Sequence, residues 1–256
     1  MVDSKVPTPA ELFDFTGKVA LITGGSRGLG REMALGFAAA GADIVIASRK
    51  IDACEAVARE VEALGRRAFP YACHIGRWNE LDGLAEAAFA KFGKVDVLVN
   101  NAGMAPTAPS ALETSEELFD KVLGVNLKAP FRLSALVATR MRAGDGGSVI
   151  NISTTGALRP QPEFTPYAAS KAGLNAMTVA LAHEFAPKVR FNVISPGAFY
   201  TDISKSWAIP GEDVPTAPLR RRGYPREIVT AALYFASEAS SYTTGALLRV
   251  DGLAPA

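Results

Sequence analysis

Residues 19–30 constrain the fold more than any other part of the sequence. An apolar run at 19–22 is typical of a buried parallel strand, and the glycines that follow end it abruptly. Gly24, Gly28 and Gly30 are spaced as T-G-x-x-x-G-x-G before a predicted helix. Glycine allows the backbone to approach a pyrophosphate closely, and the N–H groups of the first helical turn attract the anion. The spacing differs by one residue from the G-x-G-x-x-G fingerprint. A glycine-rich turn without a ligand is the alternative, but the strand–turn–helix setting favours a dinucleotide site.

Segments typical of strands and of helices alternate along the rest of the chain. We predict strands at 19–24, 43–48, 67–73, 95–101, 148–153, 189–195 and 246–251, and helices at 29–40, 52–64, 78–92, 115–141, 166–186 and 226–236. The third strand is the weakest because it contains Pro70. This alternation indicates βαβ units. The predicted fold is therefore α/β, a doubly wound, seven-stranded parallel sheet of the Rossmann type.

No linker or internal repeat divides the 256 residues, so we expect a single domain, residues 1–256. Residues 1–15 are predicted to form an N-terminal arm on its surface, because they lack the apolar core of a secretory signal. The long irregular segment at about 197–225 is rich in proline and is expected to act as a substrate lid.

Composition excludes several classes of function. A formal net charge of +1 gives no general electrostatic case for binding nucleic acid or an acidic membrane, and no apolar run approaches a membrane span. Cys54 and Cys73 are the two cysteines, and with two histidines they provide neither a disulfide framework nor zinc-binding spacing. We therefore expect no metal and a cytoplasmic location.

The end of the second strand carries information about the cofactor. An Asp or Glu is usual there when a dinucleotide has a free ribose 2′-OH, whereas this chain has Ser48, Arg49 and Lys50. Arg27 lies within the glycine loop as a further cation. Guanidinium groups bind phosphate bidentately, so the pattern favours NADP(H) over NAD(H). The alternative is that Arg49 and Lys50 are ordinary exposed cations.

Three polar residues are candidates for catalysis. Ser153 ends a predicted strand, and Tyr167 and Lys171 are four residues apart on one predicted helical face, with small residues around them. A free tyrosine has a pKa of about 10, and a nearby ammonium favours the phenolate. Tyr167 would then be the general acid and base, and Ser153 would hydrogen-bond the reacting oxygen. By itself, such a pair would more often be a surface feature of a helix, but the strand, the glycine loop and the serine all place it at one edge of the sheet.

Taken together, these motifs resemble the short-chain dehydrogenase/reductase family. The resemblance covers about residues 16–252 and rests on five segments: Thr23–Gly30, Asn100–Gly103, Ser153 with Tyr167–Lys171, Pro196-Gly197 with Thr201, and Asn126 in GVNLKAPF. It implies that Lys171 also holds the nicotinamide ribose and that Asn126 supports a proton-relaying water. It further implies a homotetramer assembled through helices 115–141 and 166–186. His74 stands where the family generally has an adenine-contacting Asp, so the Ile75 backbone is the safer contact.

The catalytic set predicted from residues and resemblance is Asn126, Ser153, Tyr167 and Lys171. The predicted cofactor-binding set is Gly24, Ser26, Arg27, Gly28, Leu29, Gly30, Ser48, Arg49, Lys50, His74, Ile75, Asn101, Ala102, Gly103, Tyr167, Lys171, Pro196, Gly197 and Thr201.

The expected activity is NADP(H)-dependent interconversion of a secondary alcohol and a ketone. Reduction of 3-oxoacyl thioesters on an acyl carrier protein is the alternative within the same chemistry. A catalytically silent NADP-binding sensor or scaffold is the alternative of another class, and the intact catalytic set argues against it. Substrate choice is expected to depend on the lid and on Met104, Thr155, Leu158 and Phe164. The run 220–222 is predicted to be a solvated arginine cluster, with phosphate or acyl-carrier binding as the other interpretation.

Overall fold

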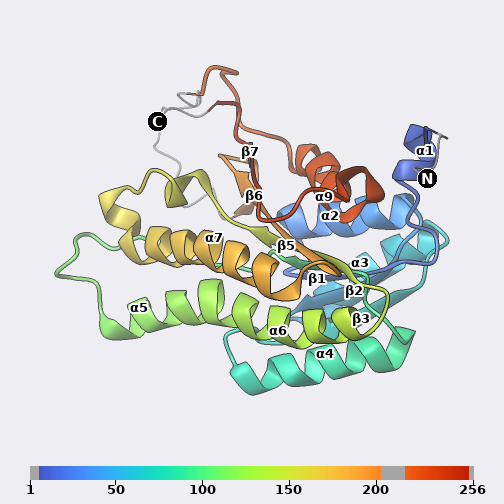
Figure 1. Cartoon of the computed structure of the whole chain (residues 1–256). Coiled ribbons are helices and arrows are strands. Elements are labelled where there is room, and N and C mark those ends of the chain that lie inside the picture. Colours follow the sequence, from blue (N-terminus) through green and yellow to red (C-terminus); the bar gives the residue numbers. More distant parts are fainter. Residues whose placement is uncertain (1–5, 203–216, 254–256) are drawn as a thin grey trace.

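A computed structural model of the chain describes residues 6–202 and 217–253, and its centre is a sheet of seven parallel strands (Figure 1). The strand order is β3-β2-β1-β4-β5-β6-β7. The strands are β1 (Val19–Thr23), β2 (Asp43–Ser48), β3 (Ala68–Ala72), β4 (Val97–Asn100), β5 (Gly147–Ile152), β6 (Val189–Pro196) and β7 (Leu247–Val250). The doubly wound Rossmann-type fold predicted from the alternation is confirmed. Pro70 is tolerated because β3 is an edge strand.

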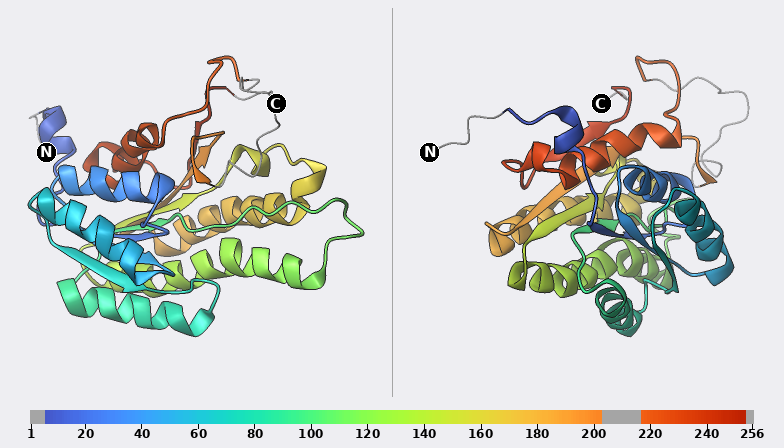
Figure 2. Two further views of the ribbon diagram at one scale, coloured as in Figure 1. Left: turned by 180° about the vertical axis from the view of Figure 1, so that it is seen from behind. Right: turned by 90° about the vertical axis from the view of Figure 1, so that its right-hand side faces the viewer.

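Helices cover both faces of the sheet (Figure 2). One layer contains α2 (Gly28–Ala39), α3 (Ile51–Ala63) and α9 (Val229–Ala236), and the other contains α4 (Trp78–Phe92), α6 (Ala129–Ala143) and α7 (Thr165–Phe185). Ala20 and Ile22 of β1 face the first layer, and Val19 and Leu21 face the second. Because successive strand residues point to opposite faces, a strand buried on both sides must be apolar throughout.

Shorter elements complete the fold. They are α1 (Pro9–Leu12), α5 (Glu116–Leu123), the π-turn η1 (Gly124–Lys128), and the 3₁₀ turns η2 (Thr155–Ala157), η3 (Pro162–Phe164), η4 (Pro225–Ile228) and η5 (Glu238–Ser240). Phe15 follows α1, is buried, and packs edge-on against Phe37 of α2 at 5.3 Å between ring centroids. This contact fixes the end of the N-terminal arm to the core.

The helix predicted at 115–141 is present, but it is not α-helical throughout. It consists of α5 and α6, which the π-turn η1 joins without a break. The Ala129 N–H bonds to the Gly124 carbonyl, and Pro130 has no N–H to donate to the Asn126 carbonyl one turn earlier. The extra residue in this turn leaves Asn126 fully buried. Such π-turns are frequent at functional sites.

The chain reverses direction in the sheet between β1 and β4. From β1 it winds outward to β2 and β3, then returns to β4 on the other side of β1. The carboxyl ends of β1 and β4 therefore form a crevice at a topological switch point, where open α/β sheets bind ligands. The glycine loop follows β1, and Asn101–Gly103 follow β4, so both predicted motifs meet there.

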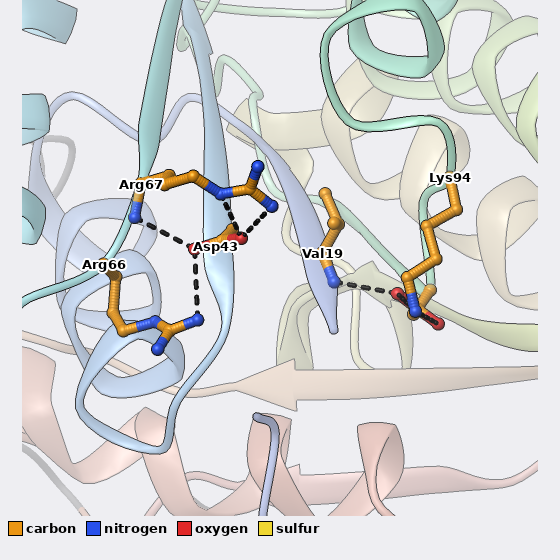
Figure 3. A network of polar contacts seen from close by, with 6 residues as sticks. Val19, Asp43, Arg66, Arg67 and Lys94 are labelled. Atoms are coloured by element: carbon orange, nitrogen blue, oxygen red, sulfur yellow. Dashed lines mark hydrogen bonds and ion pairs between the residues drawn. The ribbon is translucent and has the colours of Figure 1, made fainter. Parts of the chain in front are cut away.

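Carboxylates tie together the opposite, amino-terminal edge of the sheet (Figure 3). Asp43, the buried first residue of β2, accepts hydrogen bonds from the backbone N of Arg67 at 2.9 Å and from its Nε at 2.8 Å. Arg66 Nη2 donates to the same carboxylate at 3.2 Å. Asp96 accepts from the Val19 backbone N–H at 2.8 Å and pairs with Lys94. These contacts hold the starts of the first four strands in register.

Replacing Asp43 tests how much this edge contributes to stability. Burial raises the pKa of Asp43, but the hydrogen bonds and charge of Arg67, with the charge of Arg66, outweigh it, so the pKa lies below its usual value. The stabilisation is therefore complete above the unfolded carboxyl pKa of about 3.9 and is lost as the pH falls through the folded value. Asp43→Asn should lower the free energy of unfolding by about 1–3 kcal/mol at neutral pH.

Urea denaturation across an acid pH series measures this effect. The matched control is Asp145→Asn, because Asp145 is exposed. The loss caused by Asp43→Asn should shrink at low pH, where the native carboxyl is also neutral. Equal stability of the two variants at neutral pH would show that the Asp43 network contributes nothing measurable.

Part of the predicted lid, residues 203–216, lies outside the described residues, so the structure does not report on it. None of the helices within the described ranges is long and apolar enough to span a membrane. In those ranges, no group of three or more His, Cys, Asp or Glu side chains could hold a metal ion.

Candidate active site

The glycine loop forms a tight turn between β1 and α2. Gly24 and Gly28 have positive φ angles of 64° and 55°, which favour glycine. A Cβ atom on Gly30 would lie 2.3 Å from the Gly24 carbonyl oxygen and 2.5 Å from Asn101 Nδ2. No side chain fits at that position without moving the backbone. Ser26 and Leu29 are half-buried in the loop, and Arg27 occupies the N-cap of α2.

Asn101 and Ala102 hold the loop from the β4 side. The backbone N–H groups of both residues donate to Thr23 Oγ1, at 3.0 and 3.1 Å. Asn101 Nδ2 donates to the carbonyl oxygens of Thr23 at 2.9 Å and Gly24 at 3.3 Å. The side chain of Asn101, a predicted cofactor residue, therefore supports the loop, because its Nδ2 donates to two loop carbonyls.

The segment after β6 closes the crevice from a third side. Pro196 is the last residue of β6, and a Cβ on Gly197 would lie 2.7 Å from the Asp251 Cβ, so this turn also requires glycine. A Cβ on Gly28 would lie 3.6 Å from the methyl group of Thr201, which places Thr201 against the start of α2.

The cations that were predicted to bind a 2′-phosphate differ in their ion pairs. Arg49 and Lys50 are exposed immediately after β2, and neither forms an ion pair within the described part of the chain. Ser48 Oγ lies 3.2 Å from Cys54 Sγ on α3. Arg27 instead pairs with Asp202 at 3.3 Å, on the β6 side of the loop.

His74 and Ile75 follow β3 at the same edge of the sheet. The His74 backbone N–H donates to Glu80 Oε2 at 2.7 Å, which fixes the turn into α4. His74 Nδ1 is buried and has no hydrogen-bond partner among the described residues. A buried ring nitrogen without a partner is costly, so it is available to a polar ligand group. Ile75 is half-buried beside it.

A second cluster lies around Asn126. Its Oδ1 accepts from the Met104 backbone N at 3.0 Å, and its Nδ2 donates to the Met104 carbonyl at 2.8 Å. Nδ2 also donates to Ser170 Oγ at 3.2 Å, and Ser170 in turn donates to the Tyr167 carbonyl at 2.7 Å. Asn126 thus ties the segment after β4 to the first turn of α7. A Cβ on Gly103 would lie 3.2 Å from Asn126 Oδ1.

Lys171 is buried beneath Tyr167 on α7. Its Nζ donates to the Ile152 carbonyl at the end of β5 at 2.7 Å, and it lies 3.6 Å from the position of a Cβ on Gly103. Burial lowers the pKa of Lys171 to about 8. The backbone at Gly103, which carries no side chain, is thus adjacent to the Lys171 ammonium.

The hydroxyl beside Tyr167 belongs to Thr154, which is not among the predicted catalytic residues. The Tyr167 side chain hydrogen-bonds that of Thr154. Ser153, the residue selected, is buried, and its Oγ has no partner within the described ranges, although its backbone N bonds to the Ile194 carbonyl at 2.8 Å. The Ser153 hydroxyl therefore forms no hydrogen bond with Tyr167.

The pKa of Tyr167 differs from the expectation as well. Burial raises this pKa, and the smaller effect of the Thr154 hydrogen bond lowers it, so the net shift is upward. The lowering predicted from Lys171 is not seen in this form of the protein, in which the loss of hydration at the phenol is the largest effect. Tyr167 is accordingly a protonated acid at neutral pH.

The arrangement fits a dinucleotide bound along the carboxyl edge of the sheet. The glycines of the loop 24–30 offer a surface without side chains beside the first N–H groups of α2, and Gly103 offers another beside Lys171. Together these cradles would hold a pyrophosphate at one end and a flat ring with its ribose at the other. The Tyr167 phenol, as a proton donor, and the Thr154 hydroxyl belong to the end of the site that would hold the ring.

The chain has close relatives among known proteins. Residues 18–210 match the family model described as short chain dehydrogenase. The 7alpha-hydroxysteroid dehydrogenase of Escherichia coli is 38% identical over 240 residues, 92% of this chain and 93% of that protein. The 3-oxoacyl-(acyl-carrier-protein) reductase of Thermotoga maritima is 35% identical over 241 residues, 92% and 97% of the two chains. A solved structure of 7 alpha-hydroxysteroid dehydrogenase with NADH and 7-oxo glycochenodeoxycholic acid has a TM-score of 0.91 at 36% identity and covers 96% of this chain and 97% of that chain.

Proposed function

The chain belongs to the short-chain dehydrogenase family, and we propose that it interconverts a secondary alcohol and a ketone by NADP(H)-dependent hydride transfer, with Tyr167 as the general acid and base. The observation that carries the proposal is the hydrogen-bonded pair of Tyr167 and Thr154 above the buried Lys171, at the carboxyl edge of a Rossmann-type sheet. The bound cofactor supplies the hydride in the reductive direction.

Tyr167 provides the proton that balances this hydride. In reduction, the carbonyl oxygen gains negative charge as its carbon accepts hydride, and the Tyr167 phenol gives its proton to that oxygen. The raised pKa of Tyr167 keeps the phenol protonated until then. In oxidation, the Tyr167 phenolate takes the proton of the alcohol. The Thr154 hydroxyl hydrogen-bonds the reacting oxygen and stabilises its charge.

We assign this second role to Thr154 in place of Ser153. Thr154 already hydrogen-bonds the Tyr167 side chain, so an oxygen atom bound to the phenol lies within reach of its hydroxyl. The buried Ser153 hydroxyl has no hydrogen bond to either member of that pair. A hydroxyl contributes to transition-state stabilisation only where it faces the oxygen on which charge develops.

Lys171 and Asn126 act at the nicotinamide end of the site. The ammonium of Lys171 lies beside Gly103, where it would hold the ribose hydroxyls of a cofactor. Asn126 fixes the position of Met104 and, through Ser170, of the first turn of α7. Asn126 lies within the π-turn η1, and Pro130 leaves its carbonyl without the usual N–H donor, so this carbonyl suits a proton-relaying water.

The choice of NADP(H) rests on the end of β2. No acid stands there to accept a bond from a ribose 2′-OH, and Arg49 and Lys50 are exposed without carboxylate partners among the described residues. The solved 7 alpha-hydroxysteroid dehydrogenase contains NADH, so family membership alone does not decide the cofactor. Arg27 would contribute only after leaving Asp202.

Arg49→Ala should weaken NADP(H) binding by about ten- to a hundredfold, which corresponds to about 1.5–3 kcal/mol for a charge-assisted hydrogen bond. NAD(H) lacks the phosphate, so its affinity should hardly change. The measurement is kcat/KM for both cofactors, with Arg59→Ala on the exposed face of α3 as the charge-matched control. A parent enzyme that already prefers NAD(H), or an unchanged ratio in Arg49→Ala, would refute the assignment.

A turnover assay tests the proposed function directly. Purified protein is offered cyclic and open-chain ketones, keto sugars and 3-oxoacyl thioesters with each reduced cofactor, and oxidation of the cofactor is followed by absorbance. Preference for an acyl thioester would favour the reductase reading, which the Thermotoga maritima relative supports. Cofactor binding without turnover of any compound would favour the silent sensor.

A further inference from the structure

Two buried asparagines stand side by side in the centre of the sheet. Asn100 of β4 and Asn151 of β5 are direct partners in the parallel ladder, and their exposed fractions are 3% and 0%. Two positions earlier, each strand has an apolar residue, Leu98 or Val149, that packs against the second helix layer. Because alternate strand residues share a face, both asparagines point toward that layer, which contains α6 and α7.

The two asparagines connect the sheet to both helices, which lie side by side on this face (Figure 1). Asn100 Nδ2 donates to Ser134 Oγ of α6 at 3.0 Å and to Asn151 Oδ1 at 2.8 Å. Asn151 Nδ2 donates to Thr178 Oγ1 of α7 at 2.8 Å, and that hydroxyl donates to the Leu174 carbonyl at 2.7 Å. A chain of buried hydrogen bonds thus runs from α6 through two strands into α7.

The same arrangement of groups holds α7 at two places along its length. Near the site, Asn126 donates to Ser170, whose hydroxyl donates to the Tyr167 carbonyl. Asn151 and Thr178 repeat this pattern, in which an amide donates to a hydroxyl that bonds the carbonyl about one turn earlier. Ser170 and Thr178 are about two helical turns apart, so they lie on one face of α7. Together the two contacts fix both the rotation and the axial position of the helix.

Hydrogen bonds define the position of a helix more closely than apolar contacts do. The hydrophobic effect depends on the area that is buried and has no direction. A hydrogen bond, in contrast, is largely lost when its donor and acceptor move apart by about 1 Å. A buried amide that loses its partner also costs free energy, because it has given up its hydration. A polar network whose members are all satisfied therefore specifies one position of α7 on the sheet.

The contacts that α7 makes in the site depend on this position. Lys171 Nζ bonds the carbonyl of Ile152, which is the residue next to Asn151. The Tyr167 side chain hydrogen-bonds that of Thr154, two residues after Ile152. Both contacts thus join α7 to the end of the strand that carries Asn151. A shift of α7 by about 1 Å would lengthen the 2.7 Å bond of Lys171 beyond hydrogen-bonding range.

We propose that Asn151, acting through Thr178, is a positioning residue for the reaction, which holds α7 where Tyr167 and Lys171 meet the end of β5. Asn100 orients the Asn151 amide by donating to its Oδ1, so that Nδ2 is directed at Thr178. Neither Asn151 nor Thr178 is among the predicted catalytic residues. The inference rests on the proposed oxidoreductase function, because it concerns the placement of the proton donor of that reaction.

Thr178→Val tests the proposal, because valine keeps the shape of threonine and removes its hydroxyl. Ketone reduction should lose at least about tenfold in kcat, since small misplacements of reacting groups are costly. Thr178→Ser keeps the hydroxyl and should retain the parent kcat. The matched control is Ser148→Ala, which removes a buried hydroxyl bond of 2.8 Å to the Phe235 carbonyl from the same strand, on the side of α9. This control should lower the urea midpoint but leave kcat at the parent value.

A measurement without turnover separates this proposal from the proposed function. In protein carrying ¹³C at the tyrosine Cζ atoms, the signal that is missing from Tyr167→Phe reports hydrogen bonding of the Tyr167 phenol. It should move in Thr178→Val, and also in Asn151→Leu, which removes the donor of the same bond. It should stay at the parent position in Thr178→Ser and Ser148→Ala. A Tyr167 signal that does not move in Thr178→Val would overturn the proposal, whether or not the protein reduces a ketone. So would an equal loss of kcat in Ser148→Ala, because the loss would then follow stability alone.

Discussion

Tyr167→Phe should abolish nearly all hydride transfer while leaving cofactor binding intact. The change removes the only transferable proton of the side chain and almost none of its volume, so the packing of Phe164 against its ring should persist. General acid catalysis contributes typically about 10²–10⁴ in rate, and kcat should fall by that factor. Cofactor affinity, measured by fluorescence titration, should stay within about threefold of the parent value, because the other predicted cofactor residues, Lys171 among them, are unchanged.

The pH dependence of alcohol oxidation gives a second readout of the same substitution. Burial raises the pKa of Tyr167, so in the parent enzyme the base form is scarce at neutral pH and the oxidation rate should rise with pH. That rising limb should be absent from the residual rate of Tyr167→Phe. Near-normal turnover of the variant, or an unchanged pH limb, would show that another group moves the proton.

Thr154→Val should produce the next largest loss of activity. Valine matches threonine in shape but has no hydroxyl, so the variant loses the hydrogen bond to Tyr167 and to the reacting oxygen. Removal of one donor that stabilises developing charge costs about 10²–10³ in kcat. Thr154→Ser keeps the hydroxyl and should retain most of the activity.

Ser153→Ala is the matched comparison for this prediction. Ser153 Oγ is buried without a partner among the described residues, so its removal leaves no other group unpaired. Its kcat should therefore change by less than about tenfold. If Ser153→Ala were the more damaging of the two substitutions, the roles of these neighbouring hydroxyls would have to be exchanged.

Local sequence patterns were sufficient for the fold because each of its elements is locally encoded. Buried parallel strands are apolar on both faces, and β1 and β2 consist almost wholly of such residues. The helices that connect the strands end at positions such as Gly93, whose positive φ of 78° terminates α4. The helix at 115–141 was the exception, since its pattern is helical throughout and only Pro130 and the buried Asn126 produce the π-turn.

The site was predictable to the level of the motif but not of the single hydroxyl. Glycines such as Gly24 and Gly30 between a strand and a helix indicate that other backbone or side-chain atoms come close to them. The structure shows the steric reason, because a Cβ on either would clash with neighbouring atoms. Ser153 and Thr154 are adjacent hydroxyl residues at the end of one strand, and successive side chains point in opposite directions. Which of them faces Tyr167 depends on where the strand ends relative to α7.

By itself, the sequence determined the parallel sheet, the position of the cofactor loop and the pairing of Tyr167 with Lys171 on one helical face, because periodicity and glycine spacing are local properties. Only the tertiary structure decided that Thr154 meets Tyr167, that Arg27 pairs with Asp202, and that burial sets the direction of the Tyr167 pKa. These features depend on segments far apart in the chain. Hydration and distance between such segments are fixed by packing, which no local pattern encodes.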